Sequence, residues 1–146
     1  MPSPRVTLAF ACAVVLEAAL APLAEAACGD QPGDTAAVMA ARTDIDATCA
    51  CASFANHGAY VRCASGVIAV RVATGQLREE CKGTVKRCAA KSTCGRAGAV
   101  ACCRTNTAGR LRCTVKSSPG RCRPPKGGSA CLGTVPSCCD ACGGGD

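Results

Sequence analysis

The chain is poor in aromatic side chains and in histidine. Its 146 residues include no Trp, one Tyr, two Phe and a single histidine, His57. Few aromatic rings argue against a nucleic-acid surface that stacks bases, and scarce Leu, Phe and Trp argue against a helix that disrupts membranes. A single imidazole also offers few candidates for a general acid or base. The sequence therefore predicts no enzyme, no catalytic residue, no cofactor and no bound nucleic acid.

One apolar run near the N-terminus is long enough to target the chain for export. Arg5 precedes VTLAFACAVVL, and Ala24-Glu25-Ala26 forms an A-x-A cleavage site. This pattern predicts a secretory signal peptide over residues 1–26, because the run is too short for a membrane-spanning helix. We expect a secreted or periplasmic protein whose mature chain begins near Ala27.

Cysteine is the most distinctive component of the chain. Of sixteen cysteines, Cys12 leaves with the signal and fifteen remain. In an exported chain this density predicts disulfides, which substitute for a core that has only Phe54 and Tyr60 as aromatics. An odd number cannot all pair within one monomer. Either one thiol is free or intermolecular, or Cys28, within LAEAAC, is acylated and the protein is an outer-surface lipoprotein.

The stretch from Asn56 to Gly95 predicts two antiparallel helices. Gly75 between them suits the left-handed position past a helix end, and Gly95 supplies the next stop. In such a hairpin, positions equidistant from the turn face each other, which predicts a Cys63–Cys88 disulfide. Apolar residues recur at helical intervals in both halves: Val61, Ala64, Ile68 and Val72, then Leu77, Cys81, Val85 and Cys88.

A shorter helix is expected before this hairpin. Asp34 or Thr35 is its predicted N-cap, and Val38, Ala41 and Ile45 recur at helical spacing.

The sequence Cys49-Ala50-Cys51 follows this helix and has a spacing known from metal sites. His57 could complete such a site or serve as a general base beside a thiolate. The structural alternatives are disulfides at both cysteines and a helix start at His57, with Asn56 as N-cap. We favour the structural alternatives and predict no metal.

After Gly95 the pattern changes from helix to strand. A hairpin is expected around Asn106-Thr107-Ala108-Gly109, and folding about its centre places Cys102 opposite Cys113. A Cys102–Cys113 disulfide is predicted, with Cys103 as a competitor. The remaining Pro-, Gly- and Ser-rich segment is expected to be irregular.

Together these features predict a small disulfide-rich fold with a mainly α-helical N-terminal part. The expected organisation is one domain over 27–146, with a helical subregion (27–95) and a β-hairpin and Cys/Gly/Pro-rich subregion (96–146).

Two cysteine patterns suggest more specific sites. The order C, C, CC, C, C from Cys88 to Cys122 is similar to an inhibitor cystine knot, although its gaps are long and six cysteines allow fifteen pairings. A metal could also bind Cys138, Cys139 and Cys142, but no fourth ligand follows at a characteristic spacing.

Four segments together resemble a group of uncharacterised, cysteine-rich, exported bacterial proteins. They are IDATCACASFANHGAYVRC, CKGTVKRCAAKSTCG, CCRTNTAGRLRC and SCCDAC. The resemblance covers nearly the whole mature chain. It implies export and a helix-plus-cysteine architecture, and it implies no activity, substrate or functional residue.

Charge offers the remaining functional indication. Fifteen Lys and Arg residues lie between Arg62 and Lys126, opposed only by Glu79 and Glu80. Such a surface attracts anionic polymers or membrane headgroups, or it merely keeps an Ala-rich domain soluble. We therefore expect a non-enzymatic binding or structural protein. The alternative is a secreted inhibitor, toxin-like or antimicrobial cationic protein.

Overall fold

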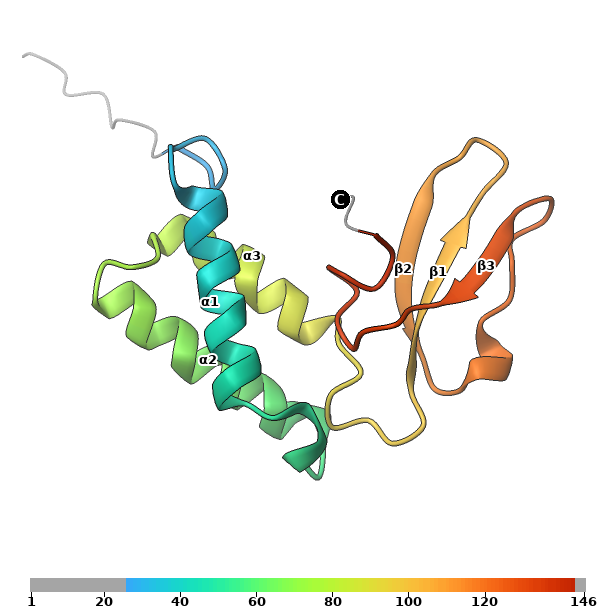
Figure 1. Cartoon of the computed structure of the whole chain (residues 1–146), viewed down its shortest axis with the longest axis horizontal. Coiled ribbons are helices and arrows are strands. Elements are labelled where there is room, and N and C mark those ends of the chain that lie inside the picture. Colours follow the sequence, from blue (N-terminus) through green and yellow to red (C-terminus); the bar gives the residue numbers. More distant parts are fainter. Residues whose placement is uncertain (1–25, 144–146) are drawn as a thin grey trace, which may run out of the picture.

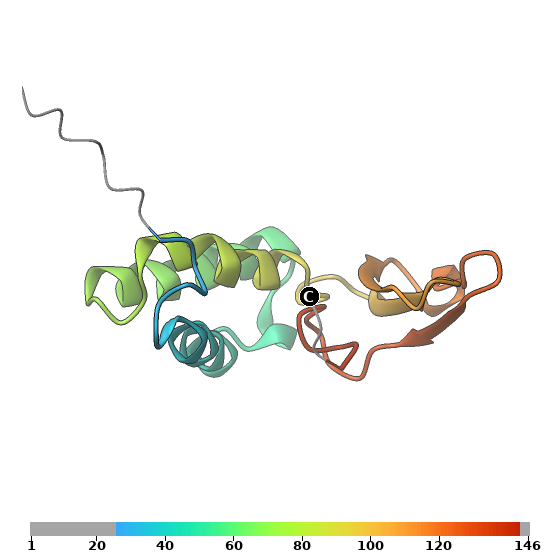
Figure 2. The ribbon, with the colours of Figure 1, turned by 90° about the horizontal axis from the view of Figure 1, so that it is seen from above.

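Three helices and a small antiparallel sheet make up the described part of the chain. The computed structural model describes residues 26–143, so the predicted signal peptide lies outside it except for Ala26. Figure 1 shows the helices grouped at one end of an elongated molecule and the sheet at the other, an arrangement that Figure 2 shows from above. The fold class expected from the sequence is confirmed. The elements are α1 (Asp34–Thr48), η1 (Cys51–Ser53), α2 (His57–Ala73), α3 (Glu79–Ala90), β1 (Val100–Thr105), β2 (Leu111–Lys116), η2 (Pro119–Arg121) and β3 (Ser129–Leu132).

Helices α2 and α3 form the predicted hairpin, and α1 packs against both of them. Gly75 lies in the turn with φ of 70°, the left-handed conformation expected from the sequence. The predicted apolar faces meet in the core, where Val61 and Val72 are partly buried at its edge. The fully buried core side chains with the largest volumes are Ile68, Leu77, Val85, Cys49 and Cys81.

The predicted Cys63–Cys88 disulfide is wrong. Cys63 bonds to Cys49 at the end of α1, and Cys88 bonds to Cys139. Cys63 lies one residue before the buried Ala64, and one helical residue rotates the side chain by about 100°. The side chain therefore turns away from the contact with α3 and toward α1. The predicted pairing considered α2 and α3 alone, whereas the partner of Cys63 lies at the end of α1.

The hairpin β1–β2 differs from its predicted register by one residue. Cys103, and not Cys102, is the partner of Cys113. The connection has Gly109 at φ of 73°, and the Asn106 side-chain oxygen accepts hydrogen bonds from the backbone N–H groups of Ala108 and Arg110. This is the geometry of a three-residue loop with a left-handed glycine. Because side chains alternate along a strand, the shift moves Cys102 to the opposite face of the sheet.

Cys102 consequently bonds to Cys122, and Cys113 bonds to Cys138, so the predicted Cys102–Cys113 disulfide is also wrong. All four candidate cysteines do form disulfides, each with a partner other than the predicted one.

The C-terminal segment is more ordered than the sequence suggests. It contains β3, which pairs with β1 to give the strand order β2-β1-β3. It then returns between the sheet and the helices, as Figure 1 shows. Its last three cysteines reach three different elements: Cys138 bonds to β2, Cys139 to α3 and Cys142 to β1. This segment therefore joins the sheet covalently to the helices.

Candidate functional site

Seven disulfides account for fourteen cysteines, and Cys131 is the free thiol of the described residues. It lies exposed on β3, in register with Cys103. The odd count therefore leaves a free thiol, which was one of the predicted alternatives. Cys28 bonds to Cys81, so its sulfur is not available for the acylation that a lipoprotein requires, and that alternative is wrong.

The pairing also contradicts an inhibitor cystine knot. A knot over the six cysteines from Cys88 to Cys122 requires the first to bond with the fourth and the second with the fifth. Here the second, Cys94, bonds to Cys51, and the first and fourth bond outside the set. Their partners come from the helical part and from the C-terminal segment, which the sequence order alone cannot reveal.

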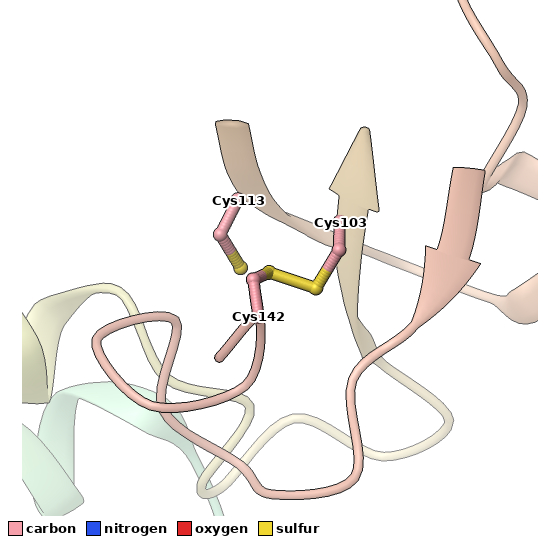
Figure 3. A group of neighbouring side chains, drawn as sticks. All are labelled: Cys103, Cys113 and Cys142. Carbon is pink, nitrogen blue, oxygen red and sulfur yellow. A yellow bond between two sulfur atoms is a disulfide. The ribbon is translucent and has the colours of Figure 1, made fainter. Parts of the chain in front are cut away.

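Two groups of side chains have the proximity of metal ligands. Figure 3 shows the first, formed by Cys103, Cys113 and Cys142, whose sulfur atoms lie within 4.8 Å of one another. The Cys103–Cys142 disulfide uses two of these sulfurs, and Cys113 is bonded to Cys138. A metal ligand has to be a thiolate, so this group is a pair of adjacent disulfides and not a metal centre.

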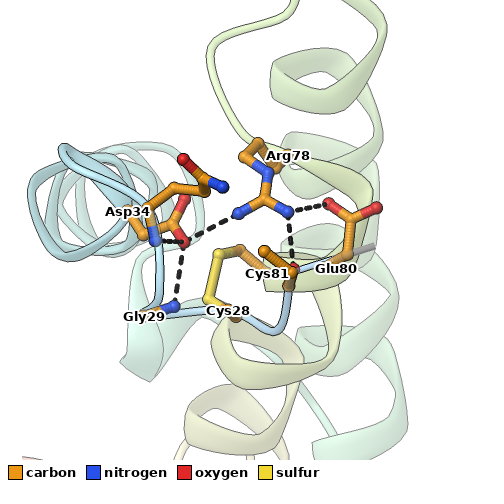
Figure 4. Close-up of a disulfide and its surroundings, with 8 residues drawn as sticks. Cys28, Gly29, Asp34, Arg78, Glu80 and Cys81 are labelled. Carbon is orange, nitrogen blue, oxygen red and sulfur yellow. Dashed lines mark hydrogen bonds and ion pairs between the residues drawn. A yellow bond between two sulfur atoms is a disulfide. The ribbon is translucent and has the colours of Figure 1, made fainter. Parts of the chain in front are cut away.

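The second group combines the Cys28–Cys81 disulfide with Asp34 (Figure 4). The N-cap of α1 is Gly33 and not the predicted Asp34 or Thr35. Asp34 is the first helical residue, and its side chain is only 4 % exposed. Its Oδ2 accepts hydrogen bonds from the backbone N–H of Gly29 at 2.9 Å and from Arg78 Nη1 at 2.9 Å. Asp34 is thus already bonded within the chain.

These bonds set the charge state of Asp34. The hydrogen bond from Gly29 lowers the pKa of the carboxyl from its ordinary value; burial opposes this, and Gln31 and Arg78 add to the lowering. Arg78 in turn donates to the carbonyl oxygen of Ala26 at 2.6 Å. The network therefore ties the start of the described chain to α3 and serves stability.

His57 begins α2, with Asn56 as its N-cap, as the structural alternative predicted. Its Nδ1 lies 2.9 Å from the carbonyl oxygen of Cys94, and its Nε2 lies 3.1 Å from that of Ala90. Cys49 and Cys51 are both in disulfides. His57 therefore holds α2 against the end of α3, and it faces neither a thiolate nor an open site.

A cluster of positive charge on the sheet is the strongest candidate site. The register places Arg104 directly opposite Arg112, and Lys116 follows on the same face. Cys102 is also on this face, and its disulfide to Cys122 brings Arg121 and Arg123 alongside. We call Arg104, Arg112, Lys116, Arg121 and Arg123 the basic face. Lys116, Arg121 and Arg123 line an open hollow at its edge.

The charges of the basic face have no carboxylate partners within residues 26–143. The acidic side chains that form ion pairs use cations of the helical part: Arg42, Arg71, Arg78 and Lys82. By contrast, eight Lys and Arg residues lie between Arg96 and Lys126 without one acidic residue among them.

Two polar atoms on the same face of the sheet also have no hydrogen-bond partner in the described structure. They are Arg104 Nε and Thr114 Oγ1, both buried. Like charges directly across a strand pair repel each other, as Arg104 and Arg112 must. An anionic group on this face would relieve the repulsion and accept hydrogen bonds from the exposed guanidinium groups, such as that of Arg112.

Sequence reasoning identified the excess of positive charge but not its distribution. The prediction counted the helical and sheet cations together, whereas the ion pairs within residues 26–143 involve four helical cations and no cation of the basic face. The absence of acidic residues between Glu80 and Asp140 is the sequence signal that could have located the site.

The comparisons with known proteins suggest no function. No family model matches the chain, and no similar protein was found among curated proteins or solved structures.

Proposed function

We propose that this chain is an exported, non-enzymatic binding protein whose basic face contacts anionic groups on a polymer or on a surface. The observation that carries the proposal is the set of sheet cations without carboxylate partners in the described structure. The seven disulfides support an oxidising compartment, such as the periplasm or the cell exterior. Membership of the exported bacterial group that the sequence resembles is part of this proposal.

The arrangement suits extended anions with many charges. Arginine presents several N–H donors in a plane, which matches phosphate, sulfate or carboxylate groups. The basic face offers four such side chains around one small sheet, and Arg112, Arg121 and Arg123 are exposed. A linear polymer can touch several of these groups at once, so that several weak contacts add up.

The experiment measures retention of the mature, oxidised protein on immobilised heparin, a sulfated polysaccharide, as salt increases. One variant replaces Arg112, Arg121 and Arg123 with Gln. Binding through fewer cations releases fewer counterions from heparin. We therefore expect the magnitude of the slope of log affinity against log salt to fall by about 2 to 3. The matched control replaces three exposed helical cations, Arg62, Lys86 and Lys91, with Gln, and we expect the slope to change little.

The outcomes separate local binding from general charge. Equal effects of the two triple variants would show that only net charge matters, and salt-independent retention would remove the electrostatic basis of the proposal. Sedimentation with vesicles of anionic or neutral lipid distinguishes headgroups from polymers. Growth inhibition by the unmodified protein, unchanged in the basic-face variant, would instead favour the antimicrobial alternative.

A further inference from the structure

A cavity lies where the helices meet the C-terminal segment, away from the basic face. Its volume is about 390 Å³, within the range of ligand-binding pockets. The end of α1 contributes Asp46, α2 contributes Tyr60, and the residues after α3 contribute Ser92. The C-terminal segment closes the other side with Val135 and Pro136. The cavity is therefore built from parts that are far apart in the sequence.

The walls of this cavity are held in place. Ser92 and Ser137 form an antiparallel bridge, and the backbone N–H of Thr93 donates to the carbonyl oxygen of Pro136 at 3.0 Å. The Cys88–Cys139 disulfide fixes the same segment to α3. Since these bonds exist before any ligand arrives, binding would not need to order the walls, which lowers its cost.

The charge of the cavity is opposite to that of the chain. Asp46 and Asp140 line it, and none of its lining residues is a Lys, Arg or His, although the chain has a net charge of +7. Asp140 is paired with Arg42, and Asp44 is paired with Arg71. Asp46 has no ion pair among residues 26–143. Asp46 is exposed, and its carboxylate is an unpaired negative charge that lines the cavity beside an apolar wall. Arg42, which pairs with Asp140, borders the adjoining hollow with Asp46 and Tyr60.

We propose that this cavity binds a small organic cation, an ammonium or guanidinium group on a short apolar stem. The cationic group pairs with Asp46, and the stem contacts Val135, Pro136 and the Tyr60 ring. Burial raises the pKa of Tyr60 and the charge of Asp46 adds to the rise, while the hydrogen bond with Ser92 and the charge of Arg42 oppose it. The Tyr60 hydroxyl oxygen can accept a hydrogen bond from an ammonium group. This site is independent of the proposed function of the basic face.

Tyrosine fluorescence tests the proposal directly, because Tyr60 is the single Tyr of the chain and there is no Trp. The probes are hexylamine, 1-hexanol and hexanoate, which share a stem and differ in the head group. We expect a saturable fluorescence change with hexylamine. We expect 1-hexanol to bind about fivefold more weakly, or more weakly still, and hexanoate not to bind. Equal affinity for hexylamine and 1-hexanol, or no saturation with hexylamine, would overturn the proposal.

Replacing the carboxylate of Asp46 tests whether hexylamine binds in this cavity. Asp46→Asn should weaken hexylamine binding about three- to tenfold and leave 1-hexanol unchanged, as expected for a partly exposed ion pair. Asp30→Asn is the matched control, because Asp30 is exposed in the turn before α1 and does not line the cavity. Similar losses in the two variants would show that hexylamine responds to overall charge and would refute the assignment. Circular dichroism confirms that both variants fold.

Discussion

Gly95→Ala tests how closely the loop after α3 approaches the start of α2. Gly95 has φ of 68°, and an added Cβ would lie 2.5 Å from the backbone carbon and oxygen of Asn56. The left-handed conformation costs alanine about 1 kcal/mol or more. Moving Asn56 also disturbs its cap on α2, worth about 1 kcal/mol, as well as the contact of His57 with the carbonyl of Cys94. We therefore expect a loss of about 3 kcal/mol, or roughly 10 °C in Tm.

The matched control is Gly83→Ala on α3. Gly83 is exposed, and an added Cβ would meet no heavy atom within 4 Å. Because alanine favours helix more than glycine does, this variant should gain about 1 kcal/mol. Thermal unfolding of the oxidised proteins, followed by circular dichroism, compares the two. If Gly95→Ala unfolds at the wild-type temperature, the loop does not pack on Asn56 and the reasoning fails.

Three further outcomes follow from the disulfides and from Asp34. Replacing both Cys28 and Cys81 with Ala opens a disulfide that spans 53 residues, so chemical denaturation should show a loss of about 4 kcal/mol in the chain-entropy model; an unchanged midpoint would contradict the pairing. Asp34→Asn should destabilise the protein at pH 7. Since the folded-state pKa of Asp34 is lowered from 3.8, the difference in unfolding free energy between wild type and variant should persist down to about that pH and decrease as the pH falls further. A difference that does not change at lower pH would show that the Asp34 carboxylate does not cause it. Iodoacetamide should label the native protein once, at Cys131, and peptide mapping that finds label elsewhere would overturn the assignment of the free thiol.

The largest errors of the sequence analysis came from register and not from the type of element. In the hairpin, a loop centred half a residue too early put Cys102 opposite Cys113 and inverted the faces. The spacing from Asn106 to Gly109 is typical of a loop with a left-handed glycine, so this information was present in the sequence. In the helices the apolar faces were predicted correctly, but the direction of Cys63 toward α1, the partner of Cys88 and the N-cap of α1 were missed.

The candidate sites were predictable to different extents. The excess of positive charge is a property of composition and was visible at once. That the cations of the sheet lack carboxylate partners within the described residues could not be predicted, because it depends on which acidic side chains reach which cations in the fold. Asp44, for example, reaches Arg71 only because α1 packs on α2. The cavity beside Asp46 was not predicted, since its walls come from both ends of the described chain.

The sequence by itself determined the helical hairpin, one β-hairpin after Gly95 and the need for disulfides. These follow from local periodicity, from glycine and from a cysteine content that compensates for a small core. Only the tertiary structure decided which cysteines pair, because bonding requires Cα atoms within about 7 Å, and distances between remote segments depend on how all the helices and strands pack together. The same packing decided that SCCDAC joins the sheet to the helices. It also decided that, within residues 26–143, the ion pairs involve four cations of the helical part and none of the basic face.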